Sequence, residues 1–176
     1  MLVDCDTNFV VAFDVYTGAK GKPREENMSA KVVLDLVRRG LKQKHHVIVM
    51  DGFFTSVYLL EQLLKVDQYA LGTTRVNRKQ FPRKTLIKEA EKQARGEWKW
   101  RQYKESTEIS VVSWMDKKPV NLISSCSDPT EKAQLPREKE GTPLRLRALL
   151  LSLCTRACEA ATQTAGWSLT LTVCAR

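Results

Sequence analysis

The stretch that decides the fold is His45-His46-Val47-Ile48-Val49-Met50-Asp51-Gly52-Phe53-Phe54-Thr55-Ser56. Its four apolar residues at 47–50 predict a strand buried on both faces, because a half-buried strand would alternate apolar and polar residues. Asp51 stands where that strand ends. In open α/β sheets the ligand-binding groups lie at the carboxyl ends of the strands, so Asp51 is placed where a metal-binding carboxylate is expected. An aspartate here can also start a turn or cap the next helix, and the neighbouring segments decide between these interpretations.

Regular segments on both sides of this strand predict a mixed sheet with helices on its faces. The expected elements are a hairpin of strands at 1–3 and 9–16, a helix from Ser29 to Arg39 ended by Gly40, a helix capped by Thr55 or Ser56, and a strand at 69–73. A strand joined to the next through a helix normally runs parallel to it, with a right-handed crossover. This order of elements fits the central part of a ribonuclease H-like fold.

The positive charge of the chain is concentrated in its middle. Residues 75–118 carry thirteen Lys/Arg against six Asp/Glu, a net +7, whereas residues 1–74 carry nine of each and residues 119–176 carry seven against five. Such a cluster attracts polyanions through counterion release from phosphates, although a solvated basic face has the same composition.

Three β-rich runs follow a basic loop at 75–84 and a short helix expected at 86–95. Residues 96–103 alternate aromatic and polar side chains, and the runs at 109–114 and 120–124 complete the set. We expect these strands to form a separate small unit.

The rest of the sequence offers no motif and several exclusions. Residues 127–142 have the composition of a polar linker, and residues 166–176 are either a strand or disordered. The five cysteines are an odd number and favour reduced thiols in an intracellular protein. The first residues lack a signal-peptide pattern, and the apolar run at 148–154 is too short to span a bilayer. We therefore expect neither secretion nor a membrane segment.

Four motifs in order resemble the piggyBac family of transposases and the cellular proteins derived from them. They are Asp14-Val15-Tyr16-Thr17-Gly18, the run from Asp51 to Ser56 with the leucines at 59–64, the run from Tyr69 to Pro82, and the run from Trp114 to Ser125. The third contains the family pattern G-T-x-R-x-N-R-K-x-x-P. Any one motif would be weak, but four in the same order are specific, and the similarity covers roughly residues 1–128.

The resemblance implies a DDE/DDD transposase core, in which three carboxylates on a ribonuclease H-like sheet hold two magnesium ions for cutting and joining DNA strands. Asp51 matches the second carboxylate and is the candidate catalytic and metal-binding residue. Gly52 departs from the asparagine that the family most often has there. The candidate DNA-binding residues are Arg75, Arg78, Lys79, Arg83 and Lys84. The aromatic residues Trp98, Trp100 and Tyr103 can stack on bases, though core packing is favoured.

Two of the three carboxylates have no match. The family's first one lies on a strand that would precede Met1, and the third follows the insertion domain in a G-V-D context that this sequence does not contain. Because a lone aspartate binds magnesium weakly, we expect no stably bound Mg²⁺ and no transposition by this chain alone. Loss of the first strand would also expose backbone groups in the middle of the sheet, so we expect aggregation or dependence on a partner.

The sequence thus predicts an α/β fold with a partial ribonuclease H-like mixed sheet, flanking helices and a small β-rich insertion unit. The expected divisions are a core at 1–75, the basic unit at 76–126 and an unmatched linker and tail at 127–176.

Three functions stay open: a catalytically inactive transposase-derived fragment with residual DNA affinity, a domesticated nucleic-acid or chromatin-binding module, and a metal-dependent DNA strand transferase or nuclease completed by another chain. The expected partners are DNA and another copy or a full-length relative, with no small-molecule substrate, and the expected location is the nucleus by resemblance and otherwise the cytoplasm.

Overall fold

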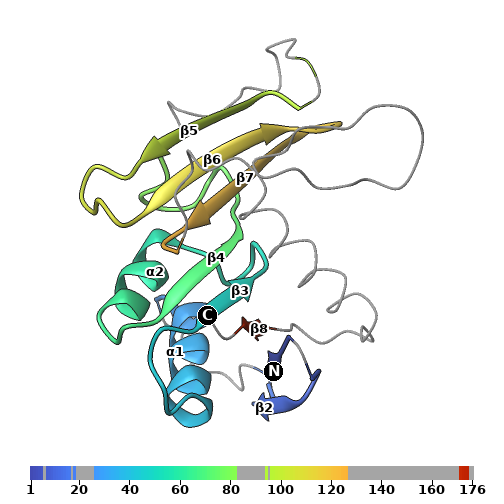
Figure 1. Cartoon of the computed structure of the whole chain (residues 1–176), viewed down its shortest axis with the longest axis vertical. Coiled ribbons are helices and arrows are strands. Elements are labelled where there is room, and N and C mark those ends of the chain that lie inside the picture. The colour runs from blue at the N-terminus through green and yellow to red at the C-terminus, as the bar shows by residue number, and fades with distance from the viewer. Residues whose placement is uncertain are drawn as a thin grey trace.

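A computed structural model describes residues 1–5, 7–16, 18, 26–82, 94, 96–126 and 171–174 of the chain. In these residues, eight strands form one mixed sheet with the order β2-β1-β8-β3-β4-β7-β6-β5, accompanied by two helices (Figure 1). The elements are β1 (Leu2–Asp4), β2 (Val10–Ala12), α1 (Met28–Gly40), β3 (Val47–Met50), α2 (Val57–Leu64), β4 (Tyr69–Thr73), β5 (Trp98–Gln102), β6 (Ser110–Met115), β7 (Pro119–Ser124) and β8 (Leu171–Cys174). The predicted α/β class with a mixed sheet is confirmed. The helix expected at 86–95 lies outside the described residues.

The strand β3 is buried along its whole length, as the apolar run predicted. Ile48 and Met50 belong to the main core cluster, whereas Val47 and Val49 pack in a second cluster against the half-buried Tyr69 and Cys126. Alternate residues of β3 therefore enter different clusters, which is why no polar residue interrupts the run. The strand pairs in parallel with β4, and α2 forms the predicted crossover between them.

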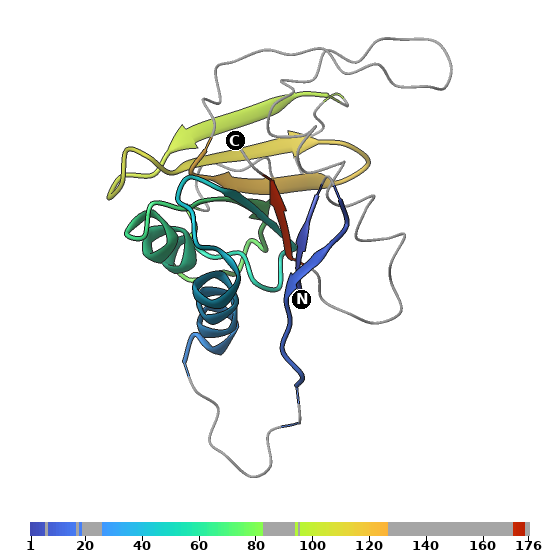
Figure 2. The same ribbon diagram turned by 60° about the horizontal axis from the view of Figure 1, so that its bottom comes forward.

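The two helices lie side by side against one face of the sheet (Figure 2). The residues that they bury there are Ala30, Val33, Leu36 and Val37 of α1 and Val57, Leu59, Leu60 and Leu63 of α2. Ser56 caps α2 as expected, because its hydroxyl accepts a hydrogen bond from the Leu59 amide at 3.2 Å. The expected cap at Ser29 is wrong: α1 begins at Met28, after Asn27, which has a left-handed φ of 57° and makes no side-chain cap.

The role expected of Gly40 also differs from the one observed. It is the last residue of α1, but it does not adopt the left-handed conformation of a glycine cap. A Cβ atom on Gly40 would lie 3.0 Å from a methyl group of Val11 and 3.1 Å from one of Leu2. The missing side chain therefore lets the end of α1 approach the β1–β2 hairpin closely.

The first two strands form the predicted antiparallel hairpin, with Leu2 opposite Ala12 and Val3 opposite Val10. The paired part of the second strand is shorter than the β-rich run at 9–16, because β1 offers only three residues to pair with. Beyond it, Phe13 and Tyr16 are exposed.

The strands β5 to β7 do not form a sheet of their own, contrary to the expected separate unit. Hydrogen bonding continues from β4 to β7, which places Gly72 opposite Ile123, and then through β6 to β5. The free edge of β4 explains the difference, since a strand edge presents unpaired backbone groups and β7 pairs with them. Leu71, Val112 and Leu122 share one buried cluster across this junction.

The strand β8 lies between β1 and β3. For residues 166–176 the sequence left a strand and disorder open, and at 171–174 the structure has a strand. In the described part of the chain, neither helix has the length and apolar character of a membrane span.

Candidate functional site

Asp51 lies at the carboxyl end of β3, where the sequence placed it, and its carboxylate takes part in a tight turn. The Oδ1 atom accepts a hydrogen bond from the Phe53 amide at 2.9 Å. The Asp51 carbonyl accepts from the Thr55 amide at 3.1 Å and from the Thr55 hydroxyl at 2.7 Å. Both interpretations of this aspartate therefore apply to its position: it stands exposed at the edge expected of a metal-binding carboxylate, and it holds the turn that leads to α2.

The turn that follows β3 packs closely against β4 at Gly72. The Thr55 side chain is fully buried there, and a Cβ atom on Gly72 would lie 2.5 Å from the Met50 carbonyl oxygen and closer still to the Thr55 hydroxyl. No side chain fits at position 72 unless the strands move apart. Sequence reasoning did not single out Gly72 or Thr55 as site residues, although a glycine inside a strand is a general signal of close backbone approach.

Gly52 behaves differently. A Cβ atom there would meet only Thr73, at 3.4 Å from its hydroxyl oxygen, which is ordinary contact. The departure from asparagine at this position is therefore not imposed by lack of space.

Arg78 reaches from the basic loop onto the same turn. Its Nη2 atom donates to the Gly52 carbonyl at 3.0 Å and also to the Phe53 carbonyl. Burial lowers the pKa of the Arg78 guanidinium, the nearby charge of Arg75 lowers it further, and the Asp51 carboxylate raises it. Arg78, a candidate DNA contact by sequence, thus ties the basic loop to the Asp51 turn.

The other described candidates of the basic loop face solvent. Arg75 is exposed, and Lys79 pairs with Glu26 at 3.1 Å between two side chains that are 85% and 78% exposed. A surface pair of this kind contributes little to stability and is readily exchanged for another anion. Arg83 and Lys84 lie outside the described residues.

Comparison with known families decides what this chain is related to. A family model described as Transposase IS4 matches residues 1–163. The chain belongs to this transposase family.

A solved structure supports the fold. The chain resembles the piggyBac transposase in its cryo-EM synaptic complex with hairpin DNA, with a TM-score of 0.61, 20% sequence identity and coverage of 84% of this chain. The match spans only 29% of that transposase chain. The ribonuclease H-like fold and the resemblance to piggyBac transposases predicted from the motifs are therefore confirmed. Comparison with curated proteins found no match.

The family match extends past residue 128, where the recognised motifs end, and stops at residue 163. It therefore enters the segment in which the sequence offered no motif. The strand β8 lies beyond it.

Transposases of the DDE type use divalent metal ions, which are held by clustered carboxylates or similar ligands. In the described ranges, no three His, Cys, Asp or Glu side chains gather closely enough to hold a metal. One oxygen of Asp51 accepts from the Phe53 amide, and the Asp51 carboxylate raises the pKa of the nearby Arg78 guanidinium. Asp4 uses its carboxylate within the hairpin turn, where it accepts from the Thr7 amide at 2.8 Å. The described residues thus do not fit a two-metal centre.

The aromatic residues of β5, and Tyr103 directly after it, pack against or within the core of the transposase sheet, as favoured over base stacking. Trp98 and Trp100 are half-buried against the cluster of Leu71 and Leu122. Tyr103 is buried, and its hydroxyl donates to Glu105 at 3.1 Å. Burial, followed by the hydrogen bond to this carboxylate, raises the pKa of Tyr103 to about 12.

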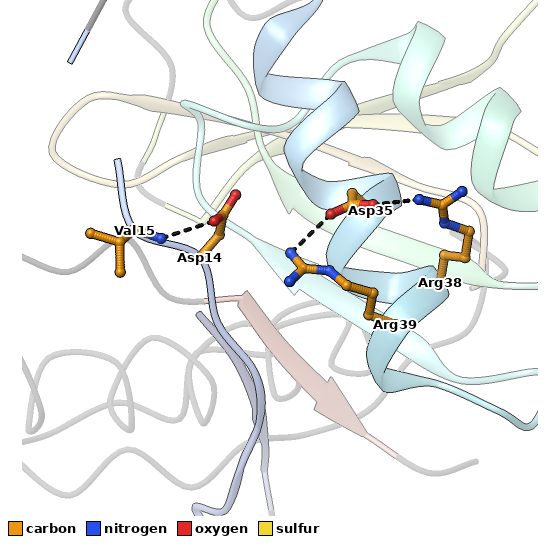
Figure 3. A network of polar contacts seen from close by, with 5 residues as sticks. All are labelled: Asp14, Val15, Asp35, Arg38 and Arg39. Carbon is orange, nitrogen blue, oxygen red and sulfur yellow. Dashed lines mark hydrogen bonds and ion pairs between the residues drawn. The ribbon is translucent and has the colours of Figure 1, made fainter. Parts of the chain in front are cut away.

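A second group of charges lies on α1 (Figure 3). Asp35 pairs with Arg38 at 2.7 Å and with Arg39 at 2.9 Å, and the hydrogen bond from Arg38 is the main cause that lowers the pKa of Asp35. Asp14, which opens the first of the four motifs, accepts from the amide of Val15 at 3.0 Å. These contacts are local to the helix and to the strand extension.

Proposed function

We propose that this transposase-family chain binds DNA through its basic segment and does not catalyse DNA cutting or joining on its own. The observation that carries the proposal is the arrangement around Asp51. The Asp51 carboxylate stabilises a turn by accepting from the Phe53 amide, and Arg78 of the basic loop donates to the backbone of the same turn. These contacts attach the basic loop to the sheet, while Arg75 and Lys79 remain exposed and can contact DNA phosphates.

Charge supports the DNA-binding part of the proposal. The segment 75–118 has a net charge of +7, and its exposed members Arg75 and Lys79 are the described candidates that are not bound to the turn. Each phosphate contact releases counterions, so the affinity for DNA should fall steeply with added salt. DNA of any sequence should bind, because contacts of this kind carry no sequence information.

The binding experiment uses the full chain and a fluorescent DNA duplex, with anisotropy measured over a series of salt concentrations. The variant Arg75→Glu/Lys79→Glu should weaken binding at every salt concentration and reduce the slope of log K against log salt by about 2, since about one unit belongs to each phosphate contact. Lys42→Glu/Lys65→Glu makes the same change of net charge at exposed positions outside the basic segment and should leave the slope nearly unchanged. Equal slopes for the two double variants, or no binding at low salt, would refute the proposal.

The catalytic part is tested separately with supercoiled and hairpin DNA in the presence of Mg²⁺ or Mn²⁺. We expect no defined nick from the wild-type chain. Asp51→Asn is the matched variant, because the asparagine oxygen can still accept from the Phe53 amide while the charge is removed. A metal-dependent nick that Asp51→Asn abolishes without loss of fold would overturn the assignment.

An origin as a fragment of a piggyBac transposase and a location in the nucleus belong to the same proposal, and imaging of the tagged full chain tests the location.

A further inference from the structure

The central part of the sheet depends on a strand from the far end of the chain. β8 runs parallel to β1, with Val3 opposite Thr172, and antiparallel to β3, with Val49 opposite the same Thr172. The strands β1 and β3 therefore do not pair with each other, and β8 joins them (Figure 1).

Two halves of the sheet meet at this strand. On one side lies the β1–β2 hairpin, and on the other lie β3, β4 and the three strands beyond them. Among the described strands, β8 provides the backbone pairing that connects the hairpin to the rest of the sheet. Side-chain packing, such as the place of Leu2 in the main core cluster, is a further connection between the hairpin and the core.

An empty position between these strands would be costly. With β8 in place, Leu2 and Ile48 are completely buried and Val49 is 3% exposed, so removal of β8 would uncover apolar side chains and leave backbone groups of both neighbours without their sheet partners. Backbone groups that lose their partners and remain shielded from water destabilise a sheet. A strand that fills the position supplies partners to both neighbours at once.

The filling strand is not part of the family match. The match ends at residue 163, and β8 covers residues 171–174. A segment beyond the family match thus provides the strand that joins β1 to β3. Main-chain pairing of this kind depends little on side-chain identity, so any extended segment of suitable length can compete for it.

We propose that the slot between β1 and β3 is a strand-binding site and that residues 171–174, Leu-Thr-Val-Cys, are its ligand. The segment binds through its main chain, in the orientation parallel to β1 and antiparallel to β3. It can be displaced from its own chain, and a separate peptide of the same sequence takes its place. This site is independent of DNA binding and of Asp51.

The test begins with the full chain carrying Thr172→Pro. Proline removes the amide proton at the centre of the four-residue strand and is excluded from central strands, because its ring also crowds the neighbouring strand. Thr172→Val is the matched control, since valine keeps the amide and favours strands. Hydrogen–deuterium exchange is measured for the amides of β1 and β3, and those of β6 and β7 serve as an internal reference in the same molecule.

The expected result is a rise of tenfold or more in the exchange rate of β1 and β3 amides in Thr172→Pro, little change in β6 and β7, and wild-type rates in Thr172→Val. A synthetic peptide of residues 166–176, added to the Thr172→Pro chain, should restore the protection, whereas the same peptide with proline at 172 should not. Unchanged exchange in Thr172→Pro would overturn the proposal. So would failure of the wild-type peptide to restore protection in a chain whose β6 and β7 remain protected.

If the Thr172→Pro chain aggregates, a refolding experiment tests strand binding instead. Thr172→Pro is then refolded from denaturant in the presence of either peptide, and the soluble yield is measured. The wild-type peptide should raise that yield at least severalfold over the proline peptide. Equal yields would refute strand binding in trans.

Discussion

Replacement of Gly72 by alanine should destabilise the chain more than any other single-methyl change near Asp51. The new Cβ atom would stand 2.5 Å from the Met50 carbonyl oxygen and closer to the Thr55 hydroxyl. Ordinary contact needs roughly 3.5 Å, so the atoms must separate by about 1 Å. Neither neighbour can turn away cheaply, because Met50 lies in a strand paired to β4 and the Thr55 hydroxyl is bonded to the Asp51 carbonyl.

The size of the effect follows from these contacts. Overpacking of a tight site costs about 1–3 kcal/mol, and two immobile neighbours place Gly72→Ala at the upper end of that range. Alanine returns roughly 0.4–1 kcal/mol by restricting the unfolded chain, since Gly72 does not need a left-handed φ. The net loss in the free energy of unfolding should be about 2 kcal/mol.

Urea unfolding of the full chain measures this loss. With a slope of about 2 kcal/mol per molar urea, the midpoint should fall by about 1 M. Gly52→Ala is the matched control, because its Cβ atom meets Thr73 only at 3.4 Å and should change the stability by less than about 0.5 kcal/mol. Equal midpoints for the two variants would refute the argument that β4 and the Asp51 turn are in contact at Gly72.

Three further substitutions test the elements around the site. Ser56→Ala removes the cap that accepts from Leu59 and should lower the free energy of unfolding by about 1 kcal/mol in the same urea assay. Arg78→Ala removes the donors to Gly52 and Phe53 and should cost about 1–2 kcal/mol; a variant of unchanged stability with weakened DNA binding would instead assign the guanidinium to DNA. Tyr103 stays protonated up to about pH 12 when folded, whereas an unfolded tyrosine loses its proton near pH 10. The folded chain therefore binds more protons between these values, and stability present below pH 10 is lost as the pH rises through 12, a loss that Tyr103→Phe should reduce in urea midpoints taken across this range.

The core of the fold was predictable because its signals are local. The run 47–50 has no polar residue, and the structure buries it on both faces. The cap at Ser56 and the leucines that follow it predicted a helix, and two strands joined through a helix normally run parallel, as β3 and β4 do. At these positions pattern, capping and topology all favour the same structure, which is the condition under which a sequence specifies its fold.

The candidate site was predictable only in position. Motif spacing placed Asp51 at the edge of the sheet, but it did not indicate that Arg78 would bind the backbone of the same turn. A basic residue in a basic segment has the same composition whether it faces phosphate or a carbonyl oxygen. The difference depends on where the folded chain places the turn relative to the basic loop, and composition does not specify that.

The place of β8 could not be derived from residues 171–174 themselves. Four residues give too short a pattern to separate a strand from irregular chain, and pairing partners, rather than propensity, decide such a segment. In the structure, β8 lies between β1 and β3 and pairs with both, in the orientation parallel to β1. Its residues lie beyond the family match, which ends at residue 163. A segment of only four residues can thus become a central strand when the sheet offers it two edges at once, because pairing on both sides satisfies its own backbone groups as well as those of its neighbours.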